Sequence, residues 1–145
     1  MVALCATLFS FAGKMGGEGF EIYLNNKLVL QQFGSQVSNV KSLQLDQRFL
    51  NDQLSVKYYH CGQAGKNRSI SIKDGQNKIL KEWRFADAPA SDAAMICPVK
   101  DILNLRKVTT STTFNLYYSS KELPNGRLLT SIVLAAESKS KSMTK

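Results

Sequence analysis

Alternation of apolar and polar residues recurs along the chain and predicts short β-strands. In residues 54–59, Leu54, Val56 and Tyr58 lie on one side of the strand, and the polar residues Ser55 and Lys57 alternate with them. A period of two residues is typical of a half-buried strand. The chain contains about nine strand-forming segments: residues 20–24, 27–33, 40–45, 54–59, 69–72, 79–85, 95–105, 114–118 and 128–134.

Polar turn residues separate these segments. The pairs Asn25-Asn26 and Asp74-Gly75 tolerate positive φ angles and predict two hairpins. Residues 121–127, KELPNGR, predict a third turn, and residues 46–52 fit either a short helical turn or a loop. Pro98 cannot donate to a strand ladder, so residues 95–105 are predicted to form an edge strand or a bulged strand, and no helix is predicted.

This pattern predicts an all-β fold, a single antiparallel β-sandwich of about 8–9 strands spanning residues 13–136. A weak internal echo relates residues 26–29, 77–80 and 126–129 at nearly equal steps. It leaves a β-trefoil or another closed β-barrel as the alternative fold. The strand phases place a set of large apolar side chains in the core: Ile22, Leu24, Leu54, Val56, Ile70, Ile72, Trp83, Leu116 and Val133.

The two ends of the chain differ from this pattern. Residues 1–12, MVALCATLFSFA, are apolar and uncharged, and they resemble the apolar region and cleavage site of a signal peptide without its positively charged start. A buried first strand or short helix is the alternative. Residues 137–145, ESKSKSMTK, lack apolar periodicity and are predicted to be a disordered basic tail. The expected location is therefore periplasmic or secreted.

Two cysteines would remain after cleavage at Ala12, Cys61 and Cys97. An even cysteine count in an exported chain favours a disulfide bond between them. Two separate buried thiols are the alternative.

Catalytic, metal-binding and cofactor-binding motifs with specific spacing are absent from the sequence. The single histidine, His60, excludes a multi-histidine metal site within one chain. Neither a phosphate-binding loop nor a nucleophile elbow is present. His60 and Cys61 are adjacent on a predicted strand and point to opposite faces, so they are not predicted to form a catalytic pair. The sequence predicts no catalytic, cofactor or metal residues.

The chain carries a net charge of +8, with basic residues spread along its length. A nucleic-acid binder gathers such residues on one element beside aromatic side chains. The nearest approach to that pattern surrounds residues 58–84, and the alternative is a solvated sheet face that keeps the protein soluble. The candidate binding face consists of Tyr58, Arg68, Lys73, Lys81, Trp83 and Arg84.

These observations favour a small exported, non-enzymatic β-sandwich of the bacterial cell envelope or exterior, with a binding or structural role. Its partner would be a protein or a polysaccharide, and no membrane-spanning segment is predicted. A cell-envelope enzyme, such as a carbohydrate-active hydrolase, is the first alternative, and it requires two carboxylates in one cleft. A cytoplasmic nucleic-acid-binding β-domain is the second, and export argues against it.

Overall fold

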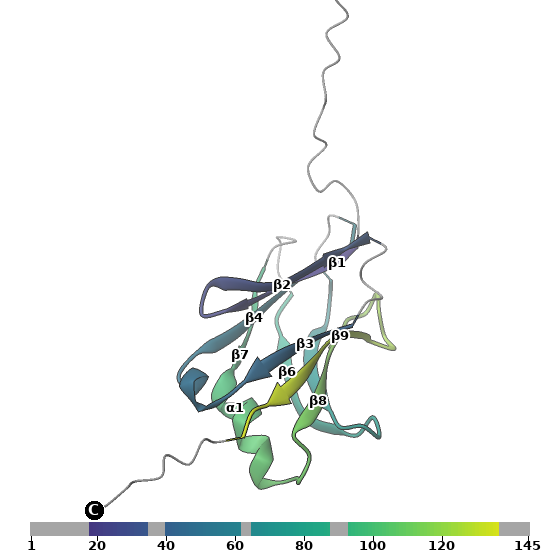
Figure 1. Cartoon of the computed structure of the whole chain (residues 1–145). Helices are drawn as coiled ribbons and strands as arrows, with labels where there is room; N and C mark the ends of the chain where they lie inside the picture. The colour runs from purple at the N-terminus through teal and green to yellow at the C-terminus, as the bar shows by residue number, and fades with distance from the viewer. Residues whose placement is uncertain (1–17, 35–39, 62–64, 88–92, 137–145) are drawn as a thin grey trace, which may run out of the picture.

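Two β-sheets pack face to face in the computed structural model, which describes residues 18–34, 40–61, 65–87 and 93–136 (Figure 1). The strand order is β2-β1-β4-β7 in the four-stranded sheet and β3-β9-β8-β5-β6 in the five-stranded sheet. Neither sheet closes into a barrel, so the predicted all-β sandwich is confirmed and the trefoil or barrel alternative is wrong. The signal-like residues 1–12 and the predicted tail 137–145 lie outside the described residues.

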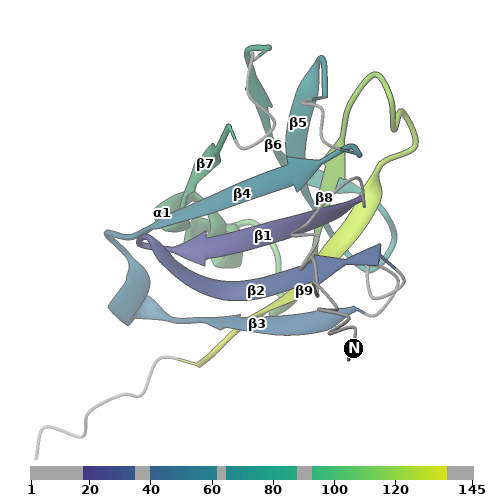
Figure 2. The same ribbon diagram turned by 90° about the horizontal axis from the view of Figure 1, so that it is seen from above.

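The four-stranded sheet is antiparallel throughout and faces the viewer in Figure 2. Asn25 and Asn26 have φ angles of 52° and 67°, which confirms the predicted tight hairpin. Two consecutive positive φ angles give the turn a twist that matches the flanking strands. The strands of this sheet are β1 (Gly19–Leu24), β2 (Lys27–Phe33), β4 (Gln53–Tyr59) and β7 (Met95–Pro98).

The five-stranded sheet departs from the antiparallel prediction at one edge. β3 runs parallel to β9, with Lys41 opposite Thr130, and the Thr130 hydroxyl donates to the Lys41 carbonyl at 2.5 Å. The other pairs of this sheet are antiparallel. Its strands are β3 (Lys41–Leu45), β5 (Arg68–Lys73), β6 (Ile79–Phe85), β8 (Thr113–Ser119) and β9 (Arg127–Leu134).

The turn between β5 and β6 differs from its prediction. Asn77, rather than Asp74 or Gly75, takes the positive φ angle of 63°. The Asp74 carboxylate accepts hydrogen bonds from the amides of Gln76 and Lys78, at 2.8 and 3.0 Å. Asparagine tolerates the left-handed region because its side chain is short and polar. The hairpin exists, but with a longer, aspartate-capped turn.

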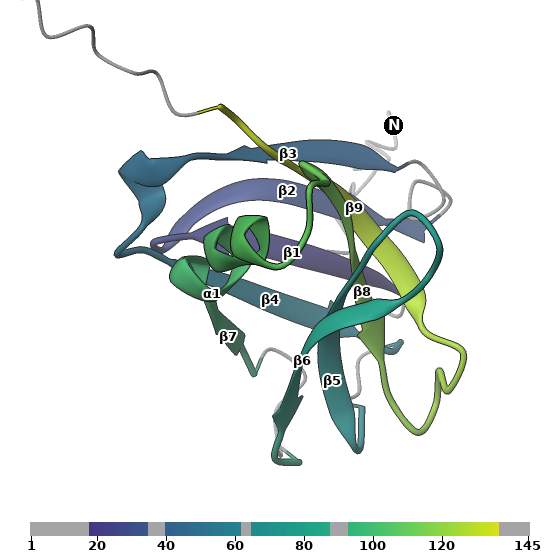
Figure 3. The ribbon, with the colours of Figure 1, turned by 90° about the horizontal axis from the view of Figure 1, so that it is seen from below.

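Residues 95–105 contain the helix that the apolar pattern did not predict. The edge strand β7 ends at Pro98, and α1 (Val99–Leu103) and the 3-10 helix η3 (Asn104–Lys107) follow (Figures 1 and 3). Val99, Ile102 and Leu103 are buried, and their i, i+3, i+4 spacing places them on one helical face. Because α1 is only about one turn long, its apolar spacing cannot be distinguished in the sequence from the pattern of a strand. Residues 46–52 adopt the helical option, the 3-10 helix η2 (Gln47–Phe49).

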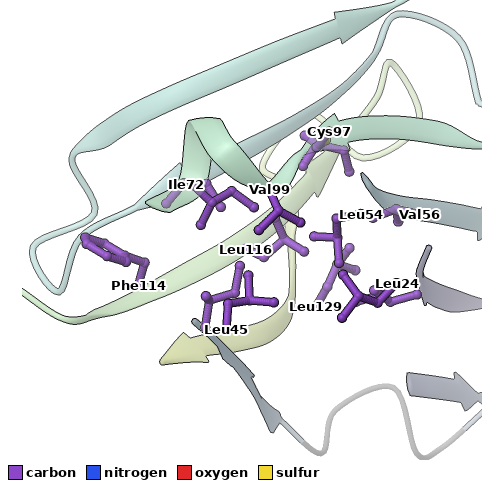
Figure 4. Packing of buried hydrophobic residues seen from close by; sticks show 14 of the residues in the cluster. Leu24, Leu45, Leu54, Val56, Ile72, Cys97, Val99, Phe114, Leu116 and Leu129 are labelled. Carbon is purple, nitrogen blue, oxygen red and sulfur yellow. The ribbon is translucent and has the colours of Figure 1, made fainter. Parts of the chain in front are cut away.

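The core lies between the sheets and extends under α1, as Figure 4 shows for Leu45, Leu54, Val99 and Leu116. Seven of the nine predicted core residues are buried: Ile22, Leu24, Leu54, Val56, Ile70, Ile72 and Leu116.

The other two predicted core residues, Val133 and Trp83, are only partly buried. In β9 the neighbours Ile132 and Leu134 are buried instead. A bulge opposite Leu116 and Tyr117 adds a residue to β9 and shifts its phase. Trp83 has the predicted inward phase, but it lies on the edge strand β6, where it packs against the margin of the core.

Candidate functional site

The six residues of the candidate binding face do not share one face of the sandwich. Two of them, Tyr58 and Arg68, are buried. Lys73 and Arg84 lie on the outer face of the five-stranded sheet. Lys73 is out of phase along β5 with the buried Ile70 and Ile72, and Arg84 is out of phase along β6 with the residues that pair with those two isoleucines. Lys81 and Trp83 lie on the inner side of the same edge. Whether any of the six binds a ligand stays a prediction.

Tyr58 belongs to a group of side chains that joins the two sheets at one end of the sandwich. Its ring stacks on that of Tyr118, with centroids 4.1 Å apart, and its centroid lies 6.5 Å from that of Phe20. Its hydroxyl donates to Glu18 at 2.5 Å, and Arg127 forms an ion pair with Glu18 at 3.3 Å. We call Glu18, Tyr58, His60, Tyr118, Ser120 and Arg127 the sheet-bridging cluster.

His60 is the titratable centre of the sheet-bridging cluster. Its Nε2 atom lies 2.7 Å from the Tyr118 hydroxyl and 3.4 Å from the Ser120 hydroxyl. Burial lowers the pKa of His60 below its ordinary value, because the imidazolium loses hydration. Ser120 is itself buried, and its hydroxyl accepts from the Leu123 amide at 3.2 Å. The side chains of the cluster therefore connect the two sheets. Ser120 is not positioned as a nucleophile, because its hydroxyl is buried and already hydrogen-bonded.

The spacing of Tyr58 and His60 in the sequence is a signal for this cluster. Tyr58 and His60 are two residues apart, so their side chains point to the same side of β4. Their rings lie 4.8 Å apart. What the sequence could not indicate is that Tyr118, from the other sheet, completes the group.

The lowered pKa of His60 predicts a loss of stability in mild acid. The unfolded chain takes up a proton near pH 6.5, whereas the folded chain does so only at lower pH. The free energy of unfolding should therefore be independent of His60 above that pH and fall below it, by at most about 1.4 kcal/mol per pH unit.

Urea unfolding between pH 5 and 7.5 measures this slope. His60 is the single histidine of the chain, so a His60→Gln variant should remove the slope in that range. An unchanged slope in the variant would refute the assignment.

The buried Arg68 joins two backbone segments that follow β6. Its guanidinium donates to the carbonyls of Ala86 and Ala93, each at 3.0 Å. These two residues lie on either side of residues 88–92, which the structure does not describe. Arg68 therefore links the two backbone segments that flank residues 88–92. This is a structural role for a residue that was predicted to bind a ligand.

Lys81 and Trp83 contact α1 through one carboxylate. Asp101 accepts a hydrogen bond from the Trp83 indole at 3.4 Å and pairs with the Lys81 ammonium at 3.7 Å. The Lys81 ammonium also lies 5.7 Å from the centre of the Trp83 ring. These contacts attach the edge strand β6 to the helix and use the polar groups of both residues.

The outer face of the five-stranded sheet carries hydroxyl, amide and charged groups. Tyr117 and Ser119 of β8 alternate there with buried neighbours, and the Lys73 ammonium lies 4.2 Å from the centre of the Tyr117 ring. At one end of this face, the ends of β5, β6 and β8 border a cleft of about 460 Å³. We call it the polar cleft, and its lining residues are Asn67, Arg68, Ser69, Glu82, Arg84, Phe85 and Ser119.

Pairing within the polar cleft fixes the orientation of its groups. The hydroxyls of Ser69 and Ser119 lie 2.6 Å apart across β5 and β8. Arg84 donates to Glu82 at 2.9 Å, and this ion pair is exposed. The lining of the cleft thus contains an acid, two guanidinium groups, an amide and two hydroxyls.

A second polar group, on the outer face of the four-stranded sheet, was not predicted. Glu21 is buried there, and its carboxylate accepts from Tyr23, Gln31 and Tyr59 at 2.6, 2.9 and 3.2 Å. The hydrogen bond to Glu21 is the main cause of a raised pKa for Tyr23. Period-two alternation identified Glu21 only as an outward residue; its burial depends on tyrosines from two strands.

The predicted disulfide is absent, because Cys61 and Cys97 are both free thiols. Cys97 lies opposite Leu54, at the start of β4, whereas Cys61 comes after the end of that strand. The five steps from Leu54 to Tyr59 alone span about 17 Å, far beyond the reach of a disulfide.

The two thiols are expected to differ in reactivity. Cys61 is exposed, whereas burial, reinforced by Asp101, raises the pKa of Cys97 to about 12. In a Cys5→Ser variant, a thiol reagent at pH 8 should therefore modify one cysteine of the folded protein and two after unfolding. Finding no free thiol in the unfolded, unreduced protein would contradict this expectation and support the disulfide bond between Cys61 and Cys97.

Within the described ranges, histidine, cysteine, aspartate and glutamate side chains form no group of three able to hold a metal ion. The same residues include no helix long and apolar enough to cross a bilayer. Neither protein-family models nor curated proteins gave a match to this chain.

Proposed function

We propose that this protein is an exported, non-enzymatic binding protein of the bacterial cell envelope or exterior, and that it binds an extended polysaccharide. The polar cleft carries this proposal. Ligand sites use a small number of placed polar groups to orient the ligand. Asn67, Ser69 and Ser119 can both donate and accept hydrogen bonds, as sugar hydroxyls do.

The position of the cleft suits a long ligand. It opens at the end of the outer sheet face, and Tyr117 and Lys73 lie further along the same face. A chain of sugars leaving the cleft would therefore meet further polar and aromatic side chains. The net charge of +8 favours polysaccharides that carry acidic groups.

The lining of the polar cleft supports binding over glycoside hydrolysis. Hydrolysis of the usual kind needs two carboxyl groups, about 5 to 9.5 Å apart, on either side of the bond that breaks. Among the described residues that line the cleft, Glu82 supplies the one carboxylate, and it is paired with Arg84. This acid is arranged to orient a ligand.

Affinity electrophoresis in gels that contain acidic or neutral polysaccharides tests the proposal. The wild-type protein should be retarded by at least one acidic polysaccharide, and Arg84→Ala should reduce that retardation at least about fivefold, because it removes a charged donor. No retardation by any polysaccharide would contradict the proposal, and release of reducing sugar would favour the hydrolase alternative.

Arg48→Ala is the matched control. The side chains of Arg84 and Arg48 are 86% and 80% exposed, and each pairs with a carboxylate two residues away. Arg48 follows β3, away from the polar cleft, so its loss changes the net charge equally and should leave retardation unchanged. An equal effect of both variants would indicate that the polysaccharide is attracted by the overall charge of the protein and not by the polar cleft.

Export rests on the signal-like residues 1–12. Mass spectrometry of the protein from its native source should find an N-terminus at or near Gly13. Cytoplasmic protein with an intact Met1 would contradict export without affecting the binding proposal.

A further inference from the structure

Three cationic side chains surround a cleft at the end of the sandwich that carries α1 and η3. This end lies opposite the polar cleft, because β8 starts here and ends there (Figure 3). The cleft has a volume of about 410 Å³. We call it the cationic cleft, and it is lined by Gln47, Leu50, Lys100, Leu103, Asn104, Arg106 and Lys107.

Among the described residues that line the cationic cleft, none carries a carboxylate. Of the acids that neighbour it along the chain, Asp101 contacts Lys81 and Trp83, and Asp46 pairs with Arg48 at 2.7 Å. Asp52 is not among the lining residues. In the part of the chain that the structure describes, neither Lys100 nor Lys107 forms an ion pair. The described lining of the cleft therefore concentrates three positive charges and contains no carboxylate that could compensate them.

Arg106 is held in place at the rim of the cationic cleft. One of its terminal nitrogens donates to the Ala135 carbonyl, which anchors the guanidinium to the end of β9. Its Nε atom is shielded from solvent and has no acceptor among the described residues. Anchoring lowers the entropy that the side chain would lose when it meets an anion.

Helix-dipole compensation does not account for the whole arrangement. Cations near the end of a helix interact favourably with its last carbonyls, which suits Arg106 and Lys107 in η3. Lys100, however, is the second residue of α1, where that effect is least favourable. The dipole also gives no reason for the amide groups of Gln47 and Asn104 in the same lining.

We propose that the cationic cleft binds a phosphate dianion, either free or as the monoester of a small organic ligand. Three cations match a double negative charge better than the single charge of a carboxylate. Lysine and arginine both bind phosphate well, the first as a point charge and the second through paired donors. Gln47 and Asn104 add neutral donors, and Leu50 and Leu103 supply an apolar wall for the organic part of an ester.

Titration of isotope-labelled full-length protein with inorganic phosphate and with phenyl phosphate, followed by NMR, tests this site. Each probe that binds should give saturable shifts in residues 47–50 and 100–107. Tighter binding of phenyl phosphate supports an ester as the ligand, and equal affinities support free phosphate. The double variant Lys100→Gln/Lys107→Gln should weaken binding at least tenfold.

The control variant is Lys66→Gln/Lys121→Gln. Both lysines are exposed and lie at the opposite end of the sandwich, so this variant removes the same charge. It should keep the wild-type affinity within about twofold, since distant exposed charges are screened by salt. Absence of saturable shifts with either probe, or equal losses in the two double variants, would overturn the site. Neither outcome bears on polysaccharide binding at the polar cleft.

Discussion

Replacing Ile132 by alanine is expected to lower the free energy of unfolding by about 2–5 kcal/mol. The Ile132 side chain is fully buried between the sheets, opposite Phe114 of β8. Its removal leaves a cavity among close-packed neighbours, and the cost is the lost hydrophobic burial together with the lost contacts around the cavity. Denaturant unfolding followed by tryptophan fluorescence measures the change.

The adjacent residue provides the control. Val133 lies on the outer face of β9 and is only partly buried, so Val133→Ala should cost less than about 1 kcal/mol. The pair compares two neighbours on one strand whose side chains point to opposite faces, and the bulge determines which of them points inward. Equal costs for the two variants would show that the strand phase in the structure is wrong.

Gly65→Ala is expected to destabilise the protein by about 1–3 kcal/mol through overpacking. A methyl group at this buried position would lie 2.9 Å from Nε2 of His60 and closer still to the Tyr118 hydroxyl. It would also come within 3.1 Å of Ser120. The sheet-bridging cluster would have to open to accept it, so the hydrogen bond between His60 and Tyr118 should be weakened. Urea unfolding and the NMR signal of the His60 ring report these two effects.

Gly75→Ala is the matched control for this substitution. Gly75 lies in the β5–β6 turn, has no positive φ angle, and would place its methyl group in open space. Alanine at such a position restricts the unfolded chain and should be neutral or stabilising by up to about 1 kcal/mol. A destabilisation equal to that of Gly65→Ala would rule out local crowding as the cause.

Local sequence patterns predicted the features that depend on neighbours along the chain. Alternation in residues 54–59 correctly placed Leu54 and Val56 in the core, because a strand sends successive side chains to opposite faces. The Asn25-Asn26 pair formed the expected turn, because both residues tolerate the left-handed region.

Local sequence patterns did not predict the features that depend on tertiary contacts. The run Ile132-Val133-Leu134 has no alternation, so its phase is set by the bulge against β8. The helical face of Val99, Ile102 and Leu103 is one turn long and gains its stability from burial.

The candidate binding residues illustrate the same limit. Arg68 and Arg84 belong to the same hairpin and both line the polar cleft, yet Arg68 is buried and bonded to backbone carbonyls whereas Arg84 is exposed. The polar cleft combines three strands, and the cationic cleft combines η2 with α1 and η3. Such groupings follow from strand order, which no local pattern contains.

The parallel pairing of β3 with β9 determines when the protein can fold during synthesis. Lys41 is paired with Thr130, so the two strands are 130 − 41 = 89 residues apart. Strands β1, β2 and β4, by contrast, lie within residues 19–59 and can pair as soon as they leave the ribosome. Nascent chains that stop before residue 127 leave the edges of β3 and β8 open, and open edges recruit other chains. Completion of the domain therefore waits for its last strand, and refolding is expected on the slow, millisecond-to-second scale of folds rich in distant contacts.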